Sequence, residues 1–211
     1  MRQFLRPPLL VTLAICILLP LVSPNNFMLD IAIRAALVAI AAIGLNLLMG
    51  FAGQISIGHA AFVAIGSYGS GILCTKLNWP PLVSLPAAAA GAALVAYIIA
   101  KPILRLKGYL VAMATLGLGI IVNMTLVNEV RWTGGPDGMA VAPLSLGKLE
   151  LTSIMHWYIV AVALLLVSIV LSLNLYDSPA GRALRGLHSS EIAARAMGVN
   201  VAAAKSQAFI V

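Results

Sequence analysis

The stretch GLNLLMGFAGQISIGHAAF, residues 44–62, lies in the middle of 41 consecutive residues, Ala35 to Thr75, that contain no Asp, Glu, Lys or Arg. A membrane-crossing helix needs about 20 predominantly apolar residues, so this region is long enough for two crossings. The stretch nevertheless carries four glycines and the polar side chains of Asn46, Gln54, Ser56 and His59. Unpaired polar groups are costly in hydrocarbon, so these side chains must face protein or a water-filled cavity rather than lipid.

The composition of the whole chain also indicates a membrane protein. Of its 211 residues, 62% are hydrophobic and 9% are charged, whereas an ordinary soluble domain is about one quarter charged. Cutting the sequence at its charges leaves the uncharged windows 7–29, 35–75, 77–100, 108–128 and 151–176. We expect an all-α polytopic membrane fold with six spans, near 8–22, 31–49, 54–75, 81–100, 108–128 and 155–174, of which the third is interrupted.

Both ends of the chain need interpretation. A seventh apolar segment begins near Val201, includes Lys205 and stops at Val211, which is too short to cross a membrane. The chain therefore reads as one transmembrane domain, 1–211, that is incomplete at its C-terminus. At the N-terminus two arginines precede an apolar run, as in a secretory signal peptide. We interpret the run as a span, because prolines frame it and Ser23-Pro24 is a poor cleavage site.

Basic residues predict the orientation. With the N-terminus in the cytoplasm, nine Lys and Arg residues fall inside and four fall outside or near the outer ends of spans, in agreement with the positive-inside rule. This orientation places residues 129–153 outside and residues 176–200 in the cytoplasm. The net charge of +7 is then a topology signal rather than a sign of nucleic-acid binding.

The outer loop contains TGGPDG, Thr133 to Gly138. Glycine supplies positive φ and proline fixes its own φ, so this sequence predicts a tight reversal of the chain. Recognition of an external partner is the alternative interpretation.

The cytoplasmic loop predicts two short helices. Asp177 or Ser178 can cap the first, with Pro179 at its first position, and Ser190 can cap the second, which runs from Glu191 to Gly198. One face of the second helix carries small and apolar residues, namely Ile192, Ala193, Ala196 and Met197. A protein groove, the lipid headgroups and plain solvent are the three possible surroundings for this face, and the groove is favoured because no Trp or Phe is present.

The sequence offers no enzyme site. A GxxxxGK[ST] loop, an HExxH motif, a GxSxG motif and a pair of carboxylates at mid-span are all missing. We therefore expect no catalytic residue and no metal site, and any energy must come from a partner or a gradient. Cys16 and Cys74 lie in apolar windows without CxxC spacing, so we interpret them as packing residues.

At this point the sequence resembles a known family. Glu191, Ala193, Ala194 and Gly198 are similar to the cytoplasmic E-A-A…G loop of ABC-importer permeases, which inserts a coupling helix into the ATP-binding subunit. Three blocks, GLNLLMGFAGQISIGHAAFVAIGSY, TGGPDG and SPAGRALRGLHSSEIAARAMGVNVAAAKSQAF, together resemble the LivM-type permeases of branched-chain amino-acid ABC importers. The chain departs from the family pattern at Ser67, His188 and Ser189.

The resemblance implies a set of partners and a location. The partners are a second homologous permease subunit, two ATP-binding subunits and a periplasmic or extracellular substrate-binding protein, in the bacterial cytoplasmic (inner) membrane. ATP hydrolysis then belongs to the partner subunits, and this chain holds no cofactor. The resemblance also implies the family's further C-terminal spans, which lie beyond this sequence.

The opening stretch can now be interpreted. A broken helix at membrane depth suits a translocation path, where freed backbone groups meet a zwitterion and apolar neighbours tolerate an aliphatic side chain. The candidate substrate-pathway residues are Asn46, Gly50, Gly53, Gln54, Ser56, Gly58 and His59. Helix packing is the competing interpretation, because the small-residue pairs Gly66/Ser70 and Ser67/Gly71 follow.

Two other functions remain open. A urea or short-amide ABC permease shares these sequence blocks. An ion-coupled secondary transporter usually has ionisable groups within its spans, and here only His59 occupies a central position.

Overall fold

The computed structural model describes residues 7–22, 25–103, 106, 108–141, 145–146, 149–150 and 153–210. The chain divides into two compact units, each of which combines an early and a late part of the sequence. Unit 1 is Met1–Asn46 with Leu151–Arg182, and unit 2 is Leu47–Glu150 with Ala183–Val211. We describe each unit by itself.

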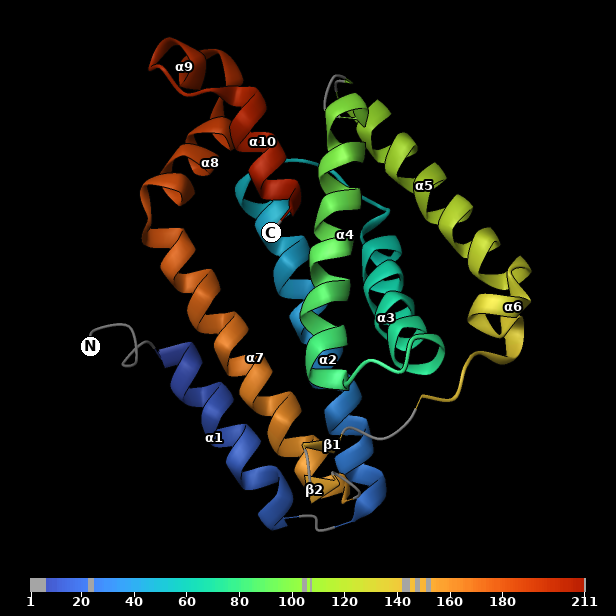
Figure 1. Ribbon diagram of the computed structural model, residues 1–211. Helices are drawn as coiled ribbons and strands as arrows, with labels where there is room; N and C mark the ends of the chain where they lie inside the picture. Colours follow the sequence, from blue (N-terminus) through green and yellow to red (C-terminus); the bar gives the residue numbers. More distant parts are fainter. Residues whose placement is uncertain are drawn as a thin grey trace. The chain divides into compact units, whose positions relative to one another are not determined.

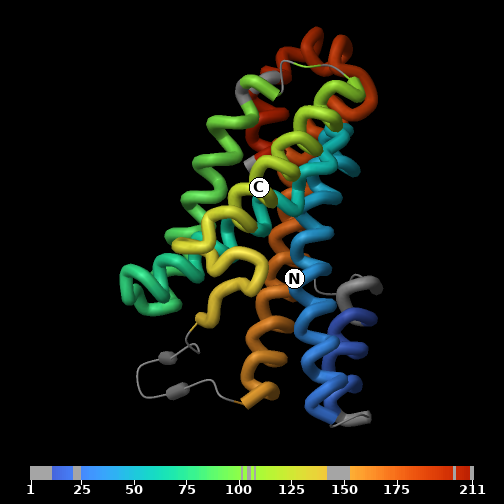
Figure 2. The backbone as a smooth tube through the Cα atoms, turned by 90° about the vertical axis from the view of Figure 1, so that its right-hand side faces the viewer, coloured from blue at the N-terminus to red at the C-terminus, as the bar shows by residue number. Residues whose placement is uncertain are grey.

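Unit 1 is built from the helices α1 (Pro7–Val22), α2 (Asn26–Asn46) and α7 (Ile154–Asp177). Figures 1 and 2 show α2 and α7 side by side along their length. Their contact contains the buried residues Ala36, Ala161 and Leu165. The Tyr158 hydroxyl donates a hydrogen bond of 2.6 Å to the carbonyl oxygen of Cys16, which joins α7 to α1.

Unit 2 contains the remaining elements and most of the residues singled out in the sequence. A π-helical turn, η1 (Leu47–Phe51), leads into an irregular segment, and three long helices follow: α3 (His59–Lys76), α4 (Pro81–Ile103) and α5 (Tyr109–Asn128). The shorter elements are α6 (Val130–Thr133), η2 (Gly135–Asp137), the antiparallel strands β1 (Ser145–Leu146) and β2 (Leu149–Glu150), α8 (Pro179–Ser189, which begins in unit 1), α9 (Glu191–Ala196) and α10 (Val201–Ile210).

Small polar residues join α3 to α4. The Ser70 and Ser84 hydroxyl oxygens are 3.1 Å apart, and Ser84 is fully buried. Gly71 is buried too, but a Cβ built on Gly66 meets nothing within 4 Å. The helix-packing interpretation of residues 66–71 therefore fits Ser70 and Gly71 and fails at Gly66. Cys16 and Cys74 are both free thiols.

Four described segments are long and apolar enough to cross a membrane: Asn26–Phe51, Pro81–Ala100, Tyr109–Asn128 and Ile154–Asp177. They coincide with four of the six predicted spans. The first prediction corresponds to a shorter apolar helix, Val11–Pro20. The third corresponds to α3, which starts only at His59 and is made less apolar by polar residues such as His59 and Lys76. The all-helical membrane architecture is thus supported, and the number of six spans stays a prediction.

Candidate functional site

The helix that begins at Asn26 breaks after Asn46. It changes to a π-turn over Leu47–Phe51, and the backbone is non-helical from Gly53 to Gly58 before α3 begins. Gly53 has a φ of +63°, a left-handed conformation that glycine adopts without steric cost. The Gln54 amide donates to the Leu48 carbonyl at 3.2 Å and closes the turn. Residues 50–59 therefore do not form a continuous helix. We call residues 47–58 the broken segment.

Side chains alternate between the two sides of the broken segment. Ala52, Gln54, Ser56 and Gly58 are buried, whereas Gly53, Ile55 and Ile57 are exposed. This is the period of two that extended backbone imposes. The polar side chains of Gln54 and Ser56 thus point into unit 2, and the two isoleucines, 48% and 57% exposed, point out of it.

Thr115 of α5 holds the end of the broken segment. Its hydroxyl accepts a hydrogen bond of 3.0 Å from the Ile57 amide and donates one of 3.0 Å to the Ala112 carbonyl. Thr115 is fully buried, and a Cβ built on Gly58 would lie 2.1 Å from its carbonyl oxygen. Glycine is therefore required at 58 for a close contact with α5. Thr115 was not among the predicted site residues, although a threonine inside an apolar span is a usable signal.

The predicted pathway residues differ in how deeply they are buried. Asn46 ends α2 and is exposed, as are Gly50 and Gly53. Gln54 is 8% exposed, and its side-chain amide donates to the Ala52 carbonyl at 3.4 Å. The buried Ser56 hydroxyl has no hydrogen-bond partner within the part of the chain that the structure describes. His59, at the start of α3, is half-buried.

A groove of about 410 Å³ runs between the end of the broken segment, α3 and α5. Its walls are mostly apolar, and Asn123 contributes an amide. The residues that define its shape include Gly58, Ala61, Ala64, Gly119, Ile120 and Asn123.

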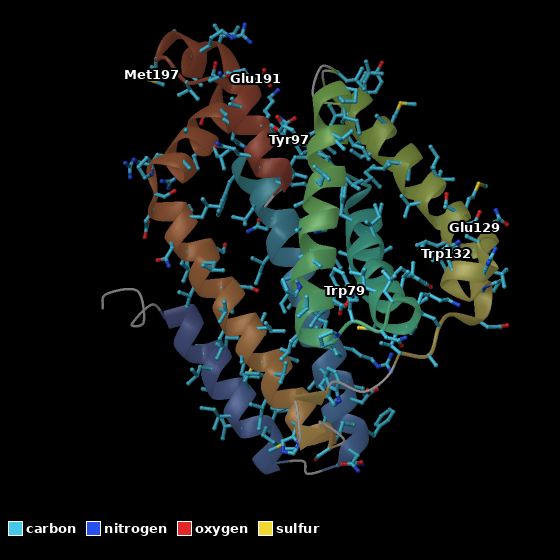
Figure 3. All side chains as sticks on the ribbon, in the orientation of Figure 1. Trp79, Tyr97, Glu129, Trp132, Glu191 and Met197 are labelled. Atoms are coloured by element: carbon cyan, nitrogen blue, oxygen red, sulfur yellow. The ribbon has the colours of Figure 1, made fainter. Side chains whose placement is uncertain are left out.

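The turn over Thr133–Gly138 is a tight reversal, as the sequence predicts. Gly134, Gly135 and Gly138 all have positive φ, and the Thr133 hydroxyl accepts a hydrogen bond of 3.1 Å from the Gly135 amide. The same hydroxyl oxygen lies 2.6 Å from the Leu126 carbonyl oxygen, which fixes the turn to the end of α5. Figure 3 shows Glu129 and Trp132 beside this turn, and both are exposed.

The two predicted cytoplasmic-loop helices are present as α8 and α9. The Ser178 hydroxyl accepts from the Gly181 amide at 3.0 Å, and the Ser190 hydroxyl accepts from the Ala193 amide at 3.2 Å. At the other end of α9, Gly198 has a φ of +84°. Two amides beyond the helix donate back to its last turn, Gly198 to Arg195 and Val199 to Ala194, each at 3.0 Å. This pair of bonds is a Schellman motif, which ends the helix and favours glycine.

One side of α9 is apolar and exposed. Ile192 is 84% exposed and Met197 is 74% exposed, and Ala193 and Ala196 are exposed beside them. We call these four residues the α9 face. Figure 3 shows Met197 and Glu191 at the α9 end of unit 2. A large isoleucine and a large methionine are thus exposed on a short helix that lies outside the four long apolar segments.

Two of the predicted contact residues lie elsewhere. Ala194 is fully buried against Leu187 and Val201, so it packs α9 onto its own chain and lies off the α9 face. Glu191 forms an ion pair with Lys205 of α10. Its carboxylate is therefore engaged within the chain. Lys205 was missed as a partner because 14 residues separate the two.

Within the described residues, no three His, Cys, Asp or Glu side chains gather in a way that could hold a metal ion.

The chain is similar in sequence to a known protein family and to two curated proteins. A family model described as "Branched-chain amino acid transport system / permease component" matches residues 27–211. The chain is 31% identical over 206 residues to the high-affinity branched-chain amino acid transport system permease protein LivM of Escherichia coli (strain K12), with 86% of this chain and 48% of the relative covered. The corresponding LivM protein of Salmonella typhimurium (strain LT2) is 31% identical over 211 residues with the same coverage.

The chain thus spans about half the length of the curated relatives it matches, 48% of each. No solved structure matches it. The family match extends over the broken segment, the turn at Thr133–Gly138 and the α9 face, from residue 27 to residue 211. On this evidence the chain belongs to the family of permease components of branched-chain amino acid transport systems.

Proposed function

We propose that this chain is a membrane-spanning permease subunit of an ATP-driven, binding-protein-dependent importer of branched-chain amino acids. The permease role follows from the family, and the relatives' names give branched-chain amino acids as their cargo. The observation that carries the ATP-driven part is the α9 face, an apolar surface on a helix that is capped at both ends and fixed to α10. ATP hydrolysis takes place on partner subunits, and the assembly includes a second permease subunit, two ATP-binding subunits and a substrate-binding protein.

A protein groove suits the α9 face better than a membrane surface. A membrane-bound helix usually adds Trp or Phe to a broad apolar face. The α9 face presents only Ile192 and the C-cap residue Met197 as large apolar side chains. A small, rigid and convex apolar surface fits a groove in a folded partner, in which two such side chains act as anchors. The ATP-binding subunit is the partner we assign to it.

The substrate pathway is proposed to run along the broken segment and its groove. Non-helical backbone at membrane depth persists only where it is buried in protein or lines a cavity. The groove lined by Ala61, Ala64 and Ile120 suits an aliphatic side chain, and Asn123 offers a polar contact. Asn46, Gly50, Gly53, Gln54, Ser56, Gly58 and His59 remain the proposed pathway residues. For Gln54 and Ser56, whose side chains are buried, the role consistent with the geometry is to shape the segment.

The docking role is tested by charging the α9 face in the complete transporter. Ile192→Asp should fold, because the side chain is 84% exposed, but should abolish co-purification of the ATP-binding subunit and uptake of leucine. Ser189→Asp is the matched control, because Ser189 is exposed on the neighbouring helix and lies outside the α9 face. Normal co-purification and uptake with Ile192→Asp would contradict the docking role.

The external turn is proposed to engage the substrate-binding protein. Replacing TGGPDG, Thr133 to Gly138, by a neutral linker of the same length should leave membrane insertion intact and weaken binding of that protein. The exposed Trp132 next to the turn is a suitable anchor for such a contact. Insertion is measured by the yield of assembled complex, and binding by titration of the labelled binding protein. Unchanged affinity and unchanged transport would leave the turn with a purely structural role.

A further inference from the structure

The charged group of Lys205 lies in an unusual place. Lys205 is 8% exposed and sits in the middle of α10, where its ammonium group donates to the carboxylate of Glu191 at the first position of α9. The Glu191 side chain is 48% exposed. An ammonium group is buried only at a large desolvation cost, which a paired carboxylate offsets. The ion pair therefore fixes the start of α9 to a defined position on α10.

The same buried side of α10, one turn beyond Lys205, reaches the broken segment. Ala204, Ala208 and Phe209 belong to one buried cluster with Leu48 and Ala52 of the broken segment, to which α4 and α8 also contribute. The Phe209 ring packs edge-on against Phe62 of α3, with ring centres 5.5 Å apart. One ten-residue helix thus contacts α9 through Lys205 and the broken segment through the cluster around Phe209.

A second contact, in which α10 takes no part, links α8 to the broken segment. A Cβ built on Gly53 would lie 2.8 Å from Nδ1 of His188, near the end of α8. His188 therefore lies against the broken segment at the residue with positive φ. All of these contacts are within unit 2.

We propose that Lys205 is a positioning residue that makes α9 and α10 move as one body, so that displacement of α9 by its partner is transmitted to the broken segment. The inference rests on the proposed function, because it takes the α9 face as the docking surface. A helix of this length is a stiff rod of about 15 Å, at a rise of about 1.5 Å per residue. The ion pair holds α10 at its middle, and the cluster of Phe209, Leu48 and Ala52 holds its C-terminal part. Energetic coupling requires such an element, whose position both sites can shift.

A merely stabilising ion pair would make a different prediction. Breaking such an ion pair would lower the amount of folded protein. Each assembled transporter would still import the normal number of substrate molecules per ATP. The readout that separates the two roles is therefore the ratio of leucine uptake to ATP hydrolysis in proteoliposomes, together with co-purification of the ATP-binding subunit.

The experiment compares Glu191→Gln, Lys205→Met and the exchanged pair Glu191→Lys with Lys205→Glu in the complete transporter. We expect each single variant to retain the ATP-binding subunit and to lower uptake per ATP by about 5- to 150-fold, the usual range for coupling between two sites. The exchanged pair should recover most of the ratio. Arg195→Met is the control, because Arg195 is exposed on the same helix, and its ratio should stay normal.

Three results would overturn the inference: a normal ratio in Glu191→Gln, a normal ratio in Lys205→Met, or an exchanged pair that couples no better than the single variants. If Lys205→Met does not assemble, Glu191→Gln carries the test, since its side chain is partly exposed and the substitution preserves its shape. A different result would show that the proposed function itself is wrong. In that case Ile192→Asp would still bind the ATP-binding subunit, whereas failure of the inference alone leaves the effect of Ile192→Asp unchanged.

Discussion

Gly58→Ala tests the contact that holds the broken segment to α5. A Cβ at this position would lie 2.1 Å from the Thr115 carbonyl oxygen, and contacts below 3.0 Å are essentially never found. The obstructing atom is backbone, so α5 and the start of α3 must separate until the distance grows from 2.1 Å to at least 3.0 Å. Such overpacking costs about 1–3 kcal/mol. The same displacement lengthens the 3.0 Å hydrogen bond between the Ile57 amide and Thr115 and alters the adjoining groove.

The assay is equilibrium unfolding of the complete protein in mixed micelles, paired with leucine uptake by the assembled transporter. Gly58→Ala should lower the free energy of unfolding by about 1–3 kcal/mol and reduce uptake. Gly66→Ala in α3 is the matched control, because nothing lies within 4 Å of its Cβ position. Alanine inside a helix is favoured over glycine by about 0.5–1 kcal/mol, so this variant should be equally or more stable. Equal effects of the two substitutions would refute the close contact at Gly58.

Two further substitutions separate structure from docking in α9. Ala194→Asp buries a carboxylate against Leu187 and Val201 and should lower the free energy of unfolding by about 3–5 kcal/mol. Ala193→Asp, on the α9 face, should leave the free energy of unfolding unchanged and weaken co-purification of the ATP-binding subunit. The reverse pattern would mean that the α9 face is misassigned. Gly198→Ala forces alanine to a φ of +84° and should lower the free energy of unfolding by about 1–2 kcal/mol in the same experiment. A neutral result would mean that the complete protein does not maintain the Schellman turn.

The positions of the helices were largely predictable because they follow from charge and apolarity alone. The predicted spans 81–100 and 108–128 correspond closely to α4 and α5, since a lipid-embedded backbone must satisfy its own hydrogen bonds as helix. The ends of α9 were predictable as well, because Ser190 and Gly198 act through local chemistry within one turn. Glycines and polar residues in an apolar region indicated that the helix is interrupted near residues 50–59, but the predicted second span ran to residue 49, past the end of α2 at Asn46.

The contacts between elements could not be predicted in the same way. Which side of α9 faces inward depends on where Leu187 and Val201 lie, and this depends on the turns at both ends of the helix. The pairing of Glu191 with Lys205 requires the reversal between α9 and α10. Thr115 could not be linked to Ile57 because 58 residues separate them, and no local pattern specifies so distant a partner.

The most direct test of the proposed function is transport by the complete protein reconstituted in proteoliposomes with its second permease, ATP-binding subunits and substrate-binding protein. Accumulation of labelled leucine, isoleucine, valine and urea is measured with ATP, without ATP, and without the binding protein. The proposal predicts accumulation of the three branched-chain amino acids that requires both ATP and the binding protein, with no accumulation of urea. Accumulation that follows an ion gradient without ATP, or of urea alone, would contradict it.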